Sequence, residues 1–115
     1  MFSFENLKVY RDSLQFAKDV YRLTNKFPKD EIFGLTSQLR RAASSVVLNI
    51  AEGSGLTKNE FKNFLRRARG SVYECVAILE IALDTKYVSE EEYKQLYERC
   101  NTLARSISAL MRKIK

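Results

Sequence analysis

Hydrophobic residues recur at three- and four-residue spacing along most of the chain, and turn-forming residues interrupt this pattern at a few places. The spacing predicts helices, and the interruptions limit them at Pro28, at Gly53 and Gly55, and before Ser89. The expected helices cover residues 7–26, 32–53, 58–86 and 90–114. Short connections of this kind favour an all-α, antiparallel up-down four-helix bundle in which residues 1–115 form a single domain.

Two of the expected helices carry more apolar surface than one bundle core usually covers. The first has one apolar stripe of Leu7, Tyr10, Leu14, Ala17 and Tyr21. A second apolar set, more than about 100° further round the helix, consists of Val9, Phe16, Val20 and Leu23. In the third helix, Tyr73, Ala77 and Ile81 lie opposite the main stripe. The surplus predicts that identical subunits associate.

Two four-residue segments match the capping box that begins many helices. They are "TKNE", Thr57 to Glu60, and "SEEE", Ser89 to Glu92. In this motif a hydroxyl and a carboxylate bind the first free backbone amides of the new helix. We therefore expect the third and fourth helices to begin at these two segments.

A polar line runs beside the apolar stripe of the second helix and consists of Gln38, Arg41, Ser45, Asn49 and Glu52. Antiparallel packing would place Ser71 and Glu74 of the third helix opposite it. Our hypothesis is an inter-helical network that fixes the register, with Arg41 and Glu74 as one pair and Glu52 level with Lys62 or Arg66. Replacing Glu52 with Gln should then lower stability. The alternative is that Asn49 and Glu52 belong to a functional site.

Charge is distributed unevenly along the chain, whose net charge is +6. Residues 1–34 carry +1, residues 35–70 carry +5, residues 71–100 carry −4 and residues 101–115 carry +4. The middle of the chain and its last segment therefore favour an anionic partner. The sequence shows neither an apolar run long enough for a membrane span nor a signal-peptide pattern, so we expect a cytoplasmic protein without a membrane partner.

The residue types needed for common catalytic and metal sites are missing. The chain has no histidine, and Cys75 and Cys100 are isolated from each other in the sequence and fall on apolar stripes. No P-loop, dinucleotide-binding glycine motif or EF-hand spacing is present. We therefore expect no catalytic residues, no metal, no cofactor and no enzymatic activity.

The first hypothesis for function is a basic surface that neutralises phosphates of RNA or DNA without reading bases. The candidate contacts are Arg40, Lys58, Lys62, Arg66, Arg67, Arg69, Arg105, Arg112, Lys113 and Lys115. The second hypothesis is a protein-interaction scaffold in which Tyr73, Tyr87 and Tyr97 are candidate anchors.

The chain resembles a known family over the motifs "QLRRAA", "NIAEG" and "ARGS", which stand in the expected order within Phe27–Glu74. The family is that of the bacterial four-helix-bundle proteins encoded in intervening sequences of 23S rRNA genes. The chain is also similar to the accessory variability determinant of diversity-generating retroelements. The resemblance implies a non-enzymatic, ring-shaped homopentamer and, in the retroelement branch, binding to nucleic acid and to a reverse transcriptase. Leu56 departs from the family, whose members often have a basic residue after "EGSG".

Overall fold

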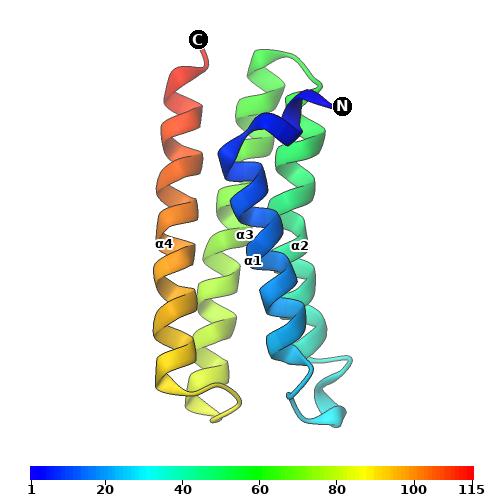
Figure 1. Ribbon diagram of the computed structural model, residues 1–115, viewed down its shortest axis with the longest axis vertical. Coiled ribbons are helices and arrows are strands. Elements are labelled where there is room, and N and C mark those ends of the chain that lie inside the picture. The colour runs from blue at the N-terminus through cyan, green and yellow to red at the C-terminus, as the bar shows by residue number, and fades with distance from the viewer.

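The computed structural model describes residues 1–115 and contains four long helices and two short 3-10 turns. The elements are η1 (Ser3–Asn6), α1 (Lys8–Thr24), η2 (Lys29–Glu31), α2 (Leu35–Ser54), α3 (Lys58–Asp84) and α4 (Glu90–Lys113). Successive helices run in opposite directions and form an elongated bundle of 43 × 22 × 21 Å (Figure 1). The predicted all-α four-helix bundle is confirmed. None of the helices combines the length and apolar character that crossing a membrane would need.

The inner faces of all four helices contribute to one continuous hydrophobic core. α2 packs on both α1 and α3, α3 packs on α4, and α4 closes the bundle against α1 less extensively. No close backbone contact joins α1 to α3 or α2 to α4. The seam between α1 and α2 and the seam between α3 and α4 therefore lie on opposite sides of the molecule.

The inner face of α1 takes residues from both apolar sets that the sequence predicts. Phe16 and Val20 of the second set are fully buried and Ala17 of the first is 7% exposed, whereas Tyr21 of the first set is 46% exposed. Two small polar residues complete the inner face. Ser13 Oγ donates a 2.8 Å hydrogen bond to the carbonyl oxygen of Tyr10, and Thr24 Oγ1 donates one of 2.8 Å to that of Val20. Each buried hydroxyl is thus satisfied within its own helix, so the core tolerates it.

The predicted capping boxes are confirmed at the start of α3 and α4. The backbone N–H of Glu60 donates a 3.2 Å hydrogen bond to Thr57 Oγ1, and that of Glu92 donates one of 3.1 Å to Ser89 Oγ. Each glutamate carboxylate accepts a bond in return from the backbone of Thr57 or Ser89. These bonds satisfy amides that would otherwise lack partners.

The other helix limits differ from the predicted ones for local reasons. α2 begins at Leu35, where Glu31 Oε1 accepts a 3.0 Å hydrogen bond from the backbone N–H, and it continues through the buried Gly53 to Ser54. α3 ends at Asp84 because Lys86 adopts a φ of 66°, the left-handed conformation that terminates many helices.

Candidate nucleic-acid interface

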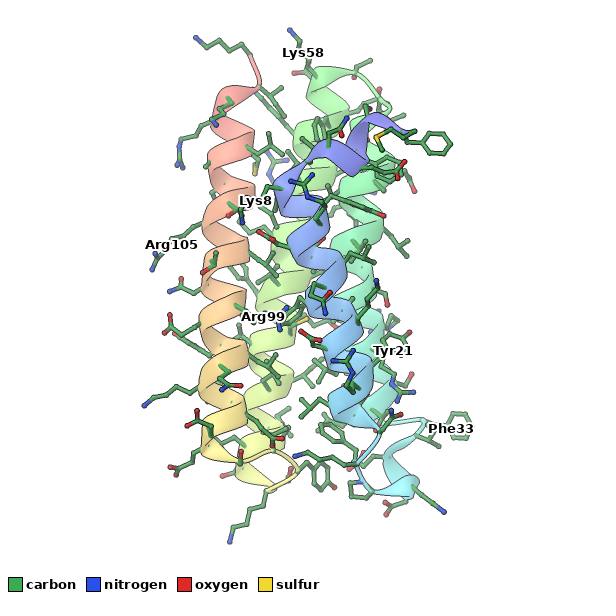
Figure 2. The ribbon with its side chains drawn as sticks, in the orientation of Figure 1. Lys8, Tyr21, Phe33, Lys58, Arg99 and Arg105 are labelled. Carbon is green, nitrogen blue, oxygen red and sulfur yellow. The ribbon has the colours of Figure 1, made fainter.

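Most of the basic residues of α3 and α4 gather at one end of the bundle. Because the two helices are antiparallel, the first half of α3 lies beside the last half of α4, and Arg69 Nη1 donates a 2.9 Å hydrogen bond to Ser108 Oγ. Residues 57–72 and 101–115 together carry nine basic residues and one acidic residue, a net charge of +8. Figure 2 shows Lys58 at the same end as the C-terminus and Arg105 pointing away from α4.

None of the nine basic residues at this end forms an ion pair. They are Lys58, Lys62, Arg66, Arg67, Arg69, Arg105, Arg112, Lys113 and Lys115, and we call them the basic end. All five ion pairs of the chain involve other cations. Glu60 is the one acidic residue within residues 57–72 and 101–115. Its carboxylate accepts hydrogen bonds from Thr57, and these bonds lower the pKa of the carboxyl. The charge of the basic end is therefore not compensated within the chain.

Arg40, the tenth candidate contact, does not belong to the basic end. Its Nε donates a 2.8 Å hydrogen bond to Thr24 Oγ1 and its Nη2 donates one of 3.1 Å to Asn25 Oδ1. The guanidinium also lies 4.9 Å from the ring centroid of Tyr21. Arg40 therefore ties α2 to the end of α1, apart from the other nine candidates, and its assignment as a phosphate contact stays a prediction.

The opposite half of the α3–α4 hairpin is acidic. Residues 73–100 carry seven acidic and three basic residues, a net charge of −4. Two ion pairs join this half to α1 and to the turn after it: Arg99 to Asp19 of α1 at 2.6 Å and Lys26 of the turn to Glu92 at 2.5 Å. The hydrogen bond from Lys26 is the main cause that lowers the pKa of Glu92. Neither pair has a local signature in the sequence, because the partners come from distant segments.

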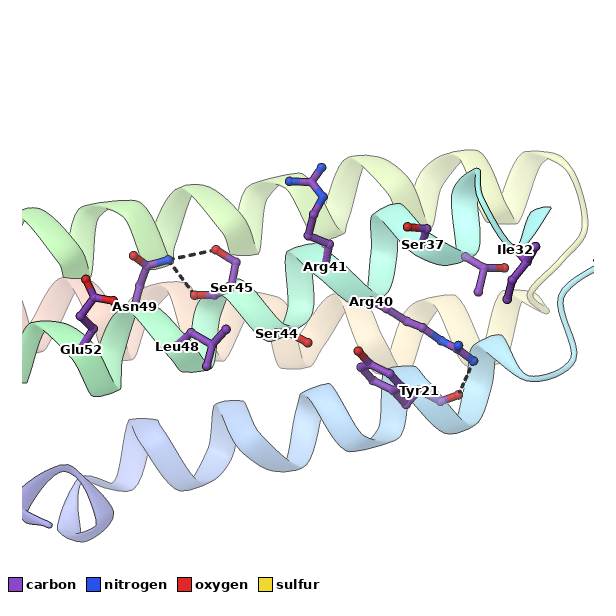
Figure 3. A pocket seen from close by; sticks show the side chains of 11 residues that line it. Tyr21, Ile32, Ser37, Arg40, Arg41, Ser44, Ser45, Leu48, Asn49 and Glu52 are labelled. Atoms are coloured by element: carbon purple, nitrogen blue, oxygen red, sulfur yellow. Dashed lines mark hydrogen bonds between the residues drawn. The ribbon is translucent and has the colours of Figure 1, made fainter.

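The polar line on α2 forms a shorter network than the one predicted. Ser71 Oγ donates a 2.9 Å hydrogen bond to Ser45 Oγ, and Arg41 lies 3.4 Å from the Glu74 carboxylate. Asn49 Nδ2 bonds within its own helix, to the carbonyl oxygen of Ser45 at 2.8 Å and to its Oγ at 2.9 Å (Figure 3).

The two ends of the predicted line are not part of that network. Glu52 is exposed and forms no ion pair with Lys62 or Arg66. Gln38 is exposed as well, and its side chain bonds to no other side chain. The polar contacts between α2 and α3 along this line are therefore those of Ser45 with Ser71 and of Arg41 with Glu74.

The two cysteines of the chain lie in the core. Burial raises the pKa of the Cys75 thiol strongly and that of Cys100 to about 12, so both thiols are protonated at neutral pH. No cluster of three histidine, cysteine or acidic side chains is placed to hold a metal ion. The arrangement can, however, attract an extended anion, because its positive charge is concentrated and exposed.

Fold and surface together define a class of small four-helix-bundle proteins with a strongly basic end. Within that class, the chain belongs to the 23S rRNA-intervening sequence protein family, whose model matches residues 5–109. A similar solved structure is a protein of unknown function from the S23 ribosomal protein family of Bacteroides thetaiotaomicron VPI-5482, with a TM-score of 0.85. It is 22% identical, and the match covers 91% of this chain and 96% of that chain, which shows a shared fold. No curated protein matches the chain.

Proposed function

We propose that the protein is a non-enzymatic, oligomeric accessory protein that binds the backbone of RNA or DNA through its basic end. One observation carries this proposal: nine cations gather in one region and none has an ion-pair partner in the chain. Phosphates would supply those partners, and release of their counterions drives binding. Phosphate contacts position a protein on nucleic acid without reading sequence.

Association of identical subunits is the second part of the proposal. An apolar groove between α1 and α2 is left open by the single chain, and Leu48 at its edge is 64% exposed. On the far side of α3, Ala77 and Ile81 are exposed as well. Five copies in a ring, the assembly that the family resemblance implies, would carry +30. A polyanion would offset the resulting repulsion.

A salt titration tests the nucleic-acid part. If about five phosphates are neutralised, the logarithm of the affinity should fall against the logarithm of the salt concentration with a slope of about −4. The measurement uses fluorescence anisotropy of labelled RNA and duplex DNA. Absence of binding at low salt would overturn the proposal and favour a scaffold that docks a protein such as a reverse transcriptase.

Two charge-reversal variants with the same change in net charge test the location. Arg105→Glu with Arg112→Glu changes the basic end, whereas Lys29→Glu with Lys94→Glu changes exposed, unpaired lysines outside it. We expect a large loss of affinity and a shallower salt slope for the first pair only. Equal losses for both pairs would mean that overall charge, and not the basic end, governs binding.

A further inference from the structure

Two rows of side chains face each other along the seam between α3 and α4. On α3, Lys62, Arg66, Arg69 and Tyr73 follow one another at helical spacing and therefore share one side of the helix. On α4, the matching row consists of Tyr97, Asn101, Arg105, Ser108 and Arg112. The hydrogen bond between Arg69 and Ser108 connects the rows. In both rows the cations lie at the basic end and the tyrosine lies furthest from it.

The two tyrosines lie beside the same shallow groove, which Asn101 and the partly buried Val76 and Ala104 also line. Tyr73 is 57% exposed and Tyr97 is 42% exposed. Neither phenol hydroxyl forms a hydrogen bond within the chain. Beyond the tyrosines the surface turns acidic, with Glu80 and Glu98 exposed. A bound anion would therefore extend from the basic end to the tyrosines and stop there.

Cations followed by exposed aromatic rings suit one form of nucleic acid in particular. A single strand offers phosphates to the cations and free base faces to the rings, whereas a duplex keeps its bases stacked inside. Base stacking on aromatic side chains does not depend on which base is present. Such a site would bind strands of many sequences.

We propose that the α3–α4 groove is a binding site for single-stranded nucleic acid, with phosphates on Arg66, Arg69 and Arg112 and bases stacked on Tyr73 and Tyr97. The inference rests on the proposed function and narrows its ligand to a single strand. The tyrosines would supply base stacking, which the charged residues alone do not provide.

The test compares three labelled probes of equal length, about 15 nucleotides. They are oligothymidine, a strand of the same length with abasic sites throughout, and a duplex. The variant is Tyr73→Ala with Tyr97→Ala, and Tyr73→Phe with Tyr97→Phe keeps the rings. Phe33→Ala is the control, because Phe33 is 95% exposed at the α1–α2 connection, away from the groove. Circular dichroism and light scattering confirm the fold and mass of each variant.

We expect the wild type to bind oligothymidine more tightly than either other probe. The alanine variant should lose about fivefold or more in affinity for oligothymidine with an unchanged salt slope, and lose nothing for the abasic strand. The phenylalanine variant and Phe33→Ala should bind like the wild type.

Several results would overturn the inference. Equal affinity of the wild type for the three probes, or an alanine variant that binds oligothymidine unchanged, would refute stacking and leave the proposed phosphate binding intact. A fall in mass of the alanine variant would instead assign the tyrosines to a contact between subunits. Failure of the wild type to bind any probe at low salt would remove the proposed function together with this inference.

Discussion

Gly53 of α2 lies directly against Phe64 of α3: a Cβ atom added to the glycine would come within 2.6 Å of the Cβ of the phenylalanine. The backbones of the two helices approach each other there because no side chain stands between them. Gly70 of α3 is the opposite case, since a Cβ added to it would meet nothing within 4 Å.

These two glycines give a matched pair of substitutions. Gly53→Ala should destabilise the protein by about 1–3 kcal/mol, because overpacking outweighs the better helix propensity of alanine. Gly70→Ala should stabilise it by about 0.5–1 kcal/mol, because only propensity changes. Urea unfolding followed by circular dichroism measures both. A Gly53→Ala variant as stable as the wild type would show that α2 and α3 can move apart at no cost.

Glu52→Gln should leave stability within about 0.5 kcal/mol of the wild type or raise it slightly. The carboxylate is exposed, has no ion-pair partner and stands near the C-terminal end of α2, where negative charge is unfavourable. This reverses the expectation drawn from the sequence. Thermal unfolding at neutral pH measures the difference in stability. A marked loss of stability in Glu52→Gln would show that Glu52 does belong to the polar network.

The ion pair between Lys26 and Glu92 predicts a pH dependence. The folded state lowers the pKa of Glu92 below its ordinary value of 4.5, so the stabilisation is present above that value and disappears as the pH falls through the lowered pKa. Glu92→Gln should cost roughly 0.5–1 kcal/mol at pH 7, a modest value because solvent screens the half-exposed pair. Denaturant unfolding across the acid range should show the two proteins converging below pH 4.5. A constant difference would mean that the charge of Glu92 contributes nothing.

Cys75 and Cys100 should resist thiol reagents in the native protein. Both side chains are almost fully buried, and burial raises the pKa of both thiols. Labelling at pH 8 should therefore follow global unfolding and speed up together with it in denaturant. Rapid labelling of the folded protein would instead show that the α3–α4 seam opens locally with a free energy well below that of global unfolding.

The period of the apolar residues predicted the helices well, because burial of several large side chains outweighs local preferences. It did not identify the inner face of α1, where the buried Ser13 and Thr24 look polar in the sequence and bond to their own backbone. Helical spacing alone could not rank two apolar stripes on one helix. Which stripe is buried depends on the helices that pack against α1, and that packing is set by the tertiary structure.

The candidate site was predictable in composition but not in arrangement. The sequence analysis named all nine residues of the basic end as candidate phosphate contacts, and antiparallel packing of α3 and α4 brings them together. The separate position of Arg40 could not be predicted, because its partners, Thr24 and Asn25, lie at the end of another helix. The position of Tyr73 opposite Tyr97 depends on the register of two helices, which single-residue patterns do not specify.

The separation of charge along the α3–α4 hairpin gives the molecule an electric dipole parallel to its long axis. In the field of a polyanion, such a subunit would turn before it touches, and productive collisions would arrive basic end first. Added salt would shorten the range of that torque to the Debye length, about 8 Å at physiological strength. Ionic strength would then control how fast complexes form as well as how long they last.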